Sequence, residues 1–223
     1  MFNQIATRYD LINHVLSLGL DILWRHSLTQ FLPKRKDLVI LDLATGTGDV
    51  LISLCLRNKN IKQAYGIDLA EKMLDIGRLK VNRVGLNSRI ILDHGDANQI
   101  PYPDGLMDAV TMAFGIRNVE DPVRVLKEMV RVLKPNGSAL ILEFSLPRFL
   151  LLKWFHLIYL KTVVPLLGGL ISGNFEAYGY LSRSIPVFPC GEAFLNLMRQ
   201  AGLQTVRSNP MIGRIATLYQ GEK

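Results

Sequence analysis

The chain has very few cysteines and no residue spacing that is typical of a metal site. Cys55 and Cys190 stand alone in a sequence of 223 residues, without a CxxC pair. Isolated cysteines suit a reducing compartment, where they mostly behave as small buried hydrophobic residues. The four histidines are far apart in the sequence, so no metal site is expected. No charged segment followed by an apolar one opens the chain, and we therefore expect a cytoplasmic protein.

Clustered positive charge is also missing, although the formal net charge is +7 and hydrophobic residues make up 49% of the chain. Basic residues are spread along the sequence, and the one small cluster is Lys34-Arg35-Lys36. A nucleic-acid-binding protein would concentrate Lys and Arg and interleave them with aromatic residues. We therefore expect no nucleic-acid partner. The positive charge indicates either a solvated surface or a surface that contacts anionic lipid.

The most informative segment runs from Asp42 to Asp49 and reads DLATGTGD. A short apolar run precedes it and an amphipathic stretch follows it, which predicts a strand, a glycine turn and a helix. Glycine has no Cβ, so the backbone at Gly46 and Gly48 can approach a ligand closely. The first turn of the helix offers unpaired N–H groups. A nucleotide-like ligand is therefore expected at this loop.

The residues around the loop narrow the choice of ligand. Asp68 lies 20 positions after Gly48, at the end of the second predicted strand, where a carboxylate can accept hydrogen bonds from both ribose hydroxyls of an adenosine. The dinucleotide fingerprint needs a third glycine where this chain has Leu51. Asp42 and Asp49 would repel a pyrophosphate and attract a cation. The loop thus favours S-adenosylmethionine, which is a sulfonium cation. The loop alone does not exclude a nicotinamide-dependent oxidoreductase.

A second polar turn, His94-Gly95-Asp96-Ala97, follows the third predicted strand. Sheets of this kind bind ligands at the carboxyl ends of their strands, so the turn can face the edge of an adenine. The Asp96 carboxylate can accept a hydrogen bond from the adenine amino group, and the Ala97 N–H can donate one. An ordinary Asp-rich turn is the alternative interpretation.

Strands and helices alternate through most of the chain, which predicts an α/β fold with a mostly parallel sheet and helices on both faces. Asp121 is expected to cap a helix that begins at Pro122, and Pro135-Asn136-Gly137 is expected to turn the chain. One domain, 1–223, is expected. The predicted strands are 39–43, 64–67, 90–92, 109–114, 139–144, 205–207 and 215–219; the predicted helices are 5–16, 22–31, 50–57, 71–82, 122–133 and 193–201.

Residues 149–171 interrupt this alternation with a strongly apolar stretch. Lys153 and Lys161 lie inside it, and each lysine would cost about 2.5–3.5 kcal/mol at the centre of a bilayer. A membrane-spanning helix is therefore disfavoured. A lid over a hydrophobic substrate, a surface that touches a membrane and an ordinary core helix all remain open.

Longer motifs are more specific than the glycine loop. They are YDLIN at 9–13 with Leu16-Ser17 and Trp24, FGIRNV at 114–119, RVLKP at 131–135 with EFS at 143–145, and Tyr180-Leu181 through Phe188-Pro189. Together these motifs resemble the class I methyltransferases, and more narrowly the demethylmenaquinone methyltransferase family, from about Phe2 to Lys223.

The resemblance implies a Rossmann-like fold with a central seven-stranded sheet, an N-terminal helical lid in residues 1–36 and an apolar helical insertion, 147–185, after the fifth strand. It implies methyl transfer from S-adenosylmethionine to a ring carbon of a polyprenylated quinol, giving menaquinol from demethylmenaquinol. Thr47 and Ala113 fall at cofactor-contact positions of the family. Ala113 replaces a residue that is frequently polar, which weakens one hydrogen bond.

Two catalytic residues are hypothesised on the same basis. Arg117 follows the fourth predicted strand, where it would orient a quinol oxygen and stabilise phenolate charge, although a surface salt bridge is the plainer interpretation. Tyr9 would close the site from the N-terminal helix. The sequence leaves open whether the protein contacts a membrane peripherally and whether it forms a homodimer. Methylation of the benzoquinol intermediate of ubiquinone biosynthesis, or of another small molecule or RNA, remains the alternative function.

Overall fold

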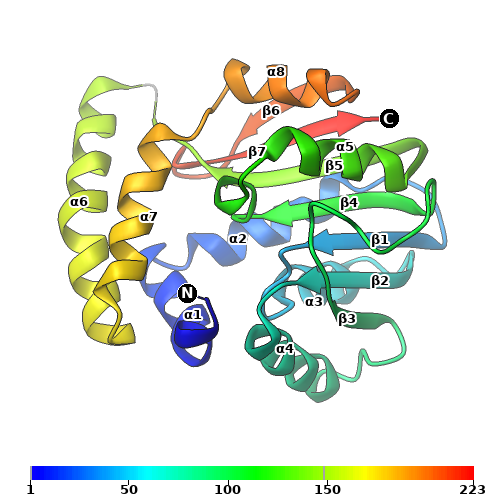
Figure 1. Ribbon diagram of the computed structural model, residues 1–223, viewed down its shortest axis with the longest axis horizontal. Coiled ribbons are helices and arrows are strands. Elements are labelled where there is room, and N and C mark those ends of the chain that lie inside the picture. The colour runs from blue at the N-terminus through cyan, green and yellow to red at the C-terminus, as the bar shows by residue number, and fades with distance from the viewer. Residues whose placement is uncertain (1, 148) are drawn as a thin grey trace.

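A seven-stranded sheet forms the centre of the computed structural model, which describes residues 2–147 and 149–223 (Figure 1). Its order is β3-β2-β1-β4-β5-β7-β6, and only β7 runs antiparallel to its neighbours. The predicted, mostly parallel sheet is thus confirmed. The strands are β1 (Leu38–Leu43), β2 (Ile61–Asp68), β3 (Ile90–His94), β4 (Met107–Ala113), β5 (Leu133–Phe144), β6 (Gln204–Pro210) and β7 (Ala216–Glu222).

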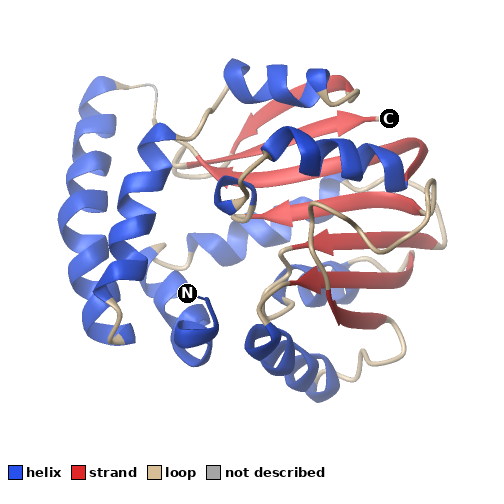
Figure 2. Ribbon diagram, viewed as in Figure 1, coloured by secondary structure: helices blue, strands red, loops and turns tan. Residues whose placement is uncertain are grey.

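Helices cover both faces of the sheet (Figure 2). On one face α2, α3 and α4 enclose a core with β1, and on the other α5 and α8 enclose a second core. Asp121 caps α5 by accepting a hydrogen bond from the Arg124 N–H at 3.1 Å, as predicted. The helices are α1 (Phe2–Leu16), α2 (Leu20–Ser27), α3 (Asp49–Arg57), α4 (Glu71–Arg83), α5 (Pro122–Val132), α6 (Leu150–Ser172), α7 (Phe175–Val187) and α8 (Glu192–Gln200), with 3-10 helices at Leu28–Phe31 (η1) and Ile116–Asn118 (η2).

The predicted turn at Pro135-Asn136-Gly137 is wrong. These residues lie inside β5, which pairs with β4 at Leu133 and then again at Ser138. The extra residues form an irregularity in which Asn136 takes a left-handed φ of 60°, a conformation that asparagine tolerates. A chain reversal and a bulge use the same residue types, so the sequence could not separate them.

Several other boundaries differ from the prediction. His94 belongs to β3 rather than to the turn that follows it, and the helix expected over 22–31 is divided into α2 and η1. The last turn of a helix commonly tightens in this way because its carbonyl groups lack partners further along the chain.

The connections around β1 determine where a ligand can bind. From β1 the chain passes through α3 to β2 on one side, whereas β4 pairs with β1 on the other side. Loops that leave neighbouring strands in opposite directions open a crevice at the carboxyl ends of those strands. The glycine loop follows β1 at this edge, and Phe114 follows β4.

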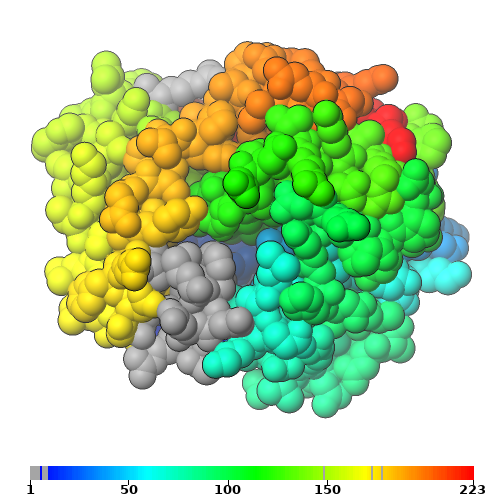
Figure 3. Space-filling view, in the orientation of Figure 1, coloured from blue at the N-terminus to red at the C-terminus, as the bar shows by residue number. Residues whose placement is uncertain are grey.

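A separate group of helices stands beyond this edge of the sheet. Figures 1 and 3 show α6 and α7 side by side on the left of the molecule, and they pack with α1 around Ile12, Leu160, Val164 and Tyr178. The predicted apolar helix after the fifth strand is confirmed. Its segment Leu150–Ile171 is long and apolar enough to cross a membrane, with 28% of the tested window buried. Length and composition of one helix are weak evidence for a membrane span.

We expect Gly77→Ala to destabilise the protein, because α4 packs very closely on the glycine loop. A Cβ at Gly77 would lie 2.7 Å from Leu92 Cδ1 and 3.1 Å from the Thr47 carbonyl carbon. Overpacking of this kind costs about 1–3 kcal/mol, which exceeds the gain of about 1 kcal/mol in helix propensity. Urea unfolding should show a lower midpoint with an unchanged slope.

Gly179→Ala is the matched control, since Gly179 also lies in a helix. Its added Cβ would meet first the flexible end of Arg183, at 3.2 Å, so we expect equal or higher stability. A Gly77→Ala protein as stable as the Gly179→Ala protein would contradict the close packing of α4.

Candidate active site

The glycine loop and Asp68 meet as expected from their spacing. Gly46 and Gly48 take left-handed φ values of 57° and 76°, which glycine adopts without steric cost. The Gly46 N–H donates to Asp68 Oδ2 at 2.8 Å, and Asp68 Oδ1 accepts from the Ala70 N–H at 2.8 Å. Burial raises the pKa of Asp68 despite these hydrogen bonds. The carboxylate is thereby fixed at the end of β2.

Asp42 is almost completely buried at the start of the loop, with 1% of its surface exposed. Thr111 Oγ1 donates to Asp42 Oδ1 at 2.5 Å. Burial raises the pKa of Asp42 to about 7, so the side chain is only partly ionised at neutral pH. Asp49 pairs with Lys80 at 2.6 Å. The loop therefore carries less free negative charge than the sequence suggested.

A hydrogen-bonded network ties the N-terminal helix to the glycine loop. Thr47 Oγ1 donates to Asp10 Oδ1 at 2.8 Å, and Lys80 Nζ donates to Thr47 Oγ1 at 2.9 Å. Lys80 also pairs with Asp10 at 2.6 Å. The Thr47 hydroxyl is thus held by α1 and α4. Asp10 and Lys80 are 70 positions apart, so no local pattern in the sequence could indicate this network.

Most of the predicted cofactor residues surround two adjoining cavities at the carboxyl ends of β1, β2 and β4. The larger, of about 240 Å³, is lined by Gly46, Asp68, Asp96, Ala97 and Ala113 together with residues of neighbouring loops. The smaller, of about 40 Å³, is lined by Asp42, Gly46, Thr47 and Ala113 among others. We call the two together the cofactor cavity.

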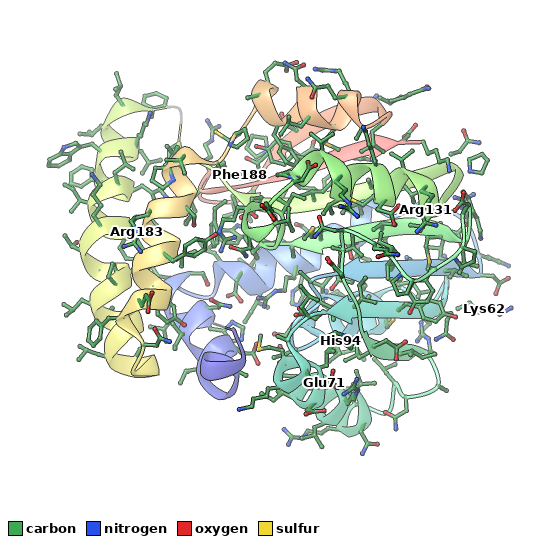
Figure 4. All side chains as sticks on the ribbon, viewed as in Figure 1. Lys62, Glu71, His94, Arg131, Arg183 and Phe188 are labelled. Carbon is green, nitrogen blue, oxygen red and sulfur yellow. The ribbon has the colours of Figure 1, made fainter. Side chains whose placement is uncertain are left out.

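Two residues near these strand ends stand apart from the cofactor cavity. Gly48 is the N-cap of α3 and lines neither part of it. His94, which Figure 4 labels, lies in β3 and is likewise absent from the lining. The turn that reaches the cavity is therefore Gly95-Asp96-Ala97.

An apolar cavity of about 80 Å³ lies beside the cofactor cavity, between the sheet edge and the helices α1, α2, α6 and α7. Phe114 and Asn118 line both cavities. An aromatic cluster forms part of the wall: the Phe114 ring centroid lies 4.4 Å from that of Phe144 and 5.9 Å from that of Trp24. These aromatic residues were not predicted as site residues, because they look like ordinary core positions in the sequence.

Arg117 is one of the polar residues in the wall of the apolar cavity. Its Nη1 pairs with Glu143 Oε1 at 2.7 Å and donates to the Phe114 carbonyl at 2.7 Å. The side chains of Arg117 and Glu143 are 8% and 1% exposed, so the surface salt bridge considered above is wrong: the pair is buried. Tyr9 belongs to α1, but its side chain is outside the described residues, and its role stays a prediction.

Comparison with known proteins identifies the family. The model of the ubiE/COQ5 methyltransferase family matches residues 1–223. The chain belongs to this family. A ubiquinone/menaquinone biosynthesis C-methyltransferase of Geotalea uraniireducens is 42% identical over the whole chain and 94% of that protein. A demethylmenaquinone methyltransferase of Thermus thermophilus is 42% identical over the full length of both chains.

Solved structures of other methyltransferases have a similar fold. A SAM-dependent methyltransferase from Aquifex aeolicus has a TM-score of 0.61 at 20% identity, over 89% of this chain and 88% of that one. Phosphoethanolamine N-methyltransferase 2 of Haemonchus contortus, solved with S-adenosylmethionine, has a TM-score of 0.64 at 14% identity, over 88% of this chain and 51% of that one. Because the chain belongs to the ubiE/COQ5 methyltransferase family and has this fold, the protein is an S-adenosylmethionine-dependent methyltransferase, as the sequence predicted.

We expect binding of S-adenosylmethionine to release a proton from Asp42. The positive charge of the cofactor favours the carboxylate, while burial holds the pKa of free Asp42 at about 7. Calorimetry at pH 7 in buffers of different ionisation enthalpy should show release of roughly half a proton, falling toward zero at about pH 9. Asp42→Asn should abolish the release. Proton release that is equal in the wild type and the variant would contradict this role of Asp42.

Proposed function

We propose that the protein methylates a ring carbon of a polyprenylated quinol and converts demethylmenaquinol to menaquinol. The observation that carries this proposal is the pair of cavities that meet at Phe114 and Asn118. One is the more polar of the two and surrounds the residues predicted to bind the cofactor, and the other is largely apolar and lined in part by aromatic rings. A flat, apolar ring in the second cavity would lie next to the methyl donor.

The residues of the cofactor cavity fit S-adenosylmethionine, which supplies an electrophilic methyl group. Asp68 would bind the ribose hydroxyls, and Asp96 with the Ala97 N–H would bind the adenine edge. Asp42 would lie on the side of the charged methionine portion. These residues hold and orient the cofactor, and Phe114 and Asn118 separate it from the acceptor. Methyl transfer then depends on holding the ring carbon at a near-attack distance of about 3–3.5 Å.

Arg117 would increase the reactivity of the ring. A phenolate pushes more electron density onto the ring carbon than a neutral phenol does, so a nearby cation that stabilises phenolate favours attack on the methyl group. Arg117 Nε is buried and has no hydrogen-bond partner within the described part of the chain. It is therefore free to donate to an oxygen of the acceptor, while Glu143 fixes the rest of the guanidinium.

The alternative functions have less support, to different degrees. The apolar lining of the acceptor cavity disfavours RNA, whose recognition needs exposed positive charge and stacking of unpaired bases. A benzoquinol fits the same lining as a naphthoquinol, and the Geotalea relative is named for both pathways. The demethylmenaquinone methyltransferases among the relatives favour the naphthoquinol.

The outer face of α6 supports peripheral contact with a membrane, where a polyprenylated substrate resides. Leu151, Trp154 and Phe155 are 69%, 58% and 57% exposed, and side chains of α6 project away from the molecule in Figure 4. Lys153 and Lys161 lie on the same helix, which contains no acidic residue. An exposed apolar stripe beside lysines is typical of a helix that lies on an anionic lipid surface.

The function and the role of Arg117 can be tested together. In a host that lacks its quinone methyltransferase, the wild-type gene should restore menaquinone, measured by mass spectrometry of the quinones. Arg117→Met combined with Glu143→Gln removes both charges of the buried pair, because Arg117→Met alone would leave Glu143 buried and unpaired. We expect this double variant to bind S-adenosylmethionine normally and to lose about 100-fold in kcat.

Arg117→Lys is the control, since it keeps a cation beside the buried Glu143 carboxylate. It should retain more activity than the double variant and bind S-adenosylmethionine equally well. Failure of the wild type to methylate a demethylmenaquinol would overturn the proposed substrate. Normal turnover by the double variant would overturn only the role of Arg117.

Vesicle flotation tests the membrane contact. We expect the wild type to float with vesicles containing phosphatidylglycerol, less at high salt, because each basic residue near the surface contributes about 1 kcal/mol. Leu151→Glu with Phe155→Glu should lower partitioning at least about 100-fold, since two large apolar side chains lose their burial. Leu56→Glu with Leu79→Glu changes residues of similar exposure on α3 and α4 and should have no effect.

Light scattering of the same variants distinguishes contact with a membrane from contact with a second copy of the chain. If the α6 variant shifts a dimer to a monomer in light scattering and leaves flotation unchanged, this face binds another copy and the membrane proposal fails.

A further inference from the structure

Among the residues that the structure describes, three buried polar atoms in the wall of the apolar cavity have no hydrogen-bond partner: Arg117 Nε, Asn118 Oδ1 and His156 Nε2. More than about 90% of buried polar groups in proteins are paired, because leaving one unpaired is destabilising. Three such atoms around one cavity indicate a ligand that supplies the missing partners. The set contains a donor at Arg117 and an acceptor at Asn118.

His156 comes from a different part of the fold than the other two residues. Arg117 and Asn118 belong to η2, next to the cofactor cavity, whereas His156 belongs to α6, which stands away from the sheet (Figure 1). The side chain of His156 is buried, with 9% of the residue exposed. Burial lowers the pKa of His156, so the ring is neutral at pH 7. When Nδ1 carries the proton, Nε2 accepts a hydrogen bond.

Several other polar groups of the cavity are already occupied. Tyr159 donates its hydroxyl proton to the Leu16 carbonyl at 2.7 Å. Arg25 pairs with Asp21 at 2.8 Å, and Asp21 also accepts from Ser17 at 2.7 Å. His156 is thus available on α6 to accept a hydrogen bond from a bound molecule.

We propose that His156 is a positioning residue whose Nε2 accepts a hydrogen bond from one hydroxyl of the acceptor ring, while Arg117 and Asn118 hold the other oxygen. This inference rests on the proposed function, because it is the quinol that carries oxygens at both ends of its ring. Contact at both ends fixes the rotation of the ring within its plane. That rotation decides whether the one unsubstituted carbon of the quinol ring faces the cofactor cavity, so His156 aligns this carbon for methylation.

Steady-state kinetics with a short-chain demethylmenaquinol should reveal this role. We expect His156→Leu to raise KM about tenfold, as for the loss of one hydrogen bond to a buried group, with unchanged affinity for S-adenosylmethionine. His156→Gln should restore KM to within about threefold of the wild type, since a glutamine amide oxygen also accepts a hydrogen bond. The rate of methyl transfer in a single turnover should also fall in His156→Leu and recover in His156→Gln, because a ring that is free to rotate presents its reactive carbon less often.

A purely structural role would give a different result. In that case both variants would lose thermal stability and cofactor binding together, and glutamine would rescue neither KM nor the single-turnover rate. Unchanged KM and an unchanged single-turnover rate in His156→Leu, or failure of glutamine to rescue, would overturn the inference while wild-type turnover leaves the proposed function intact. No turnover by the wild type would instead reject the proposed function itself.

Discussion

The site depends on one constraint, the opposite directions in which the chain leaves β1 and β4 at the same edge of the sheet. Because these strands are parallel neighbours, the glycine loop and Phe114 begin side by side. Phe114 takes a φ of 57°, and a left-handed conformation costs a non-glycine residue of order 1–3 kcal/mol. The Phe114 N–H also donates to the Leu142 carbonyl at 2.7 Å. The fold holds this strained residue at the point where the two cavities meet.

Residues of the N-terminal helices α1 and α2 contact both cavities. Asp10 of α1 binds Thr47 in the glycine loop, while Asn13 and Leu16 of the same helix line the apolar cavity. Arg25 of α2 lines both the apolar cavity and the smaller part of the cofactor cavity. A movement of α1 would therefore change both cavities together. A helix that closes over a site excludes water, which strengthens the electrostatic interactions inside the site.

The sequence predicted those parts of the site that rest on local patterns. The glycine loop, the cap at Asp121 and Asp68 at the end of its strand each depend on a few neighbouring residues and on the general geometry of parallel sheets. The predicted turn at Asn136 is a bulge in the structure, since only the pairing of β5 with β4 distinguishes a bulge from a turn. Lys80 and Asp10 meet through tertiary packing alone. The sequence also could not indicate that His156 lines a cavity, because only the packing of α6 brings this residue there.

The buried pair of Arg117 and Glu143 is better explained by function than by stability. Removing two charges from water is costly, and a buried ion pair often contributes no more than well-packed apolar residues of the same volume would. Here the pair stands beside an aromatic cluster, with the Arg117 Cζ 5.3 Å from the Phe144 ring centroid. Glu143 is directed inward from the end of a central strand and binds both the backbone N–H and the Nη1 of Arg117. A guanidinium held this rigidly in an apolar cavity does not need to reorganise when negative charge develops on the acceptor, and preorganisation is what makes such a group effective in catalysis.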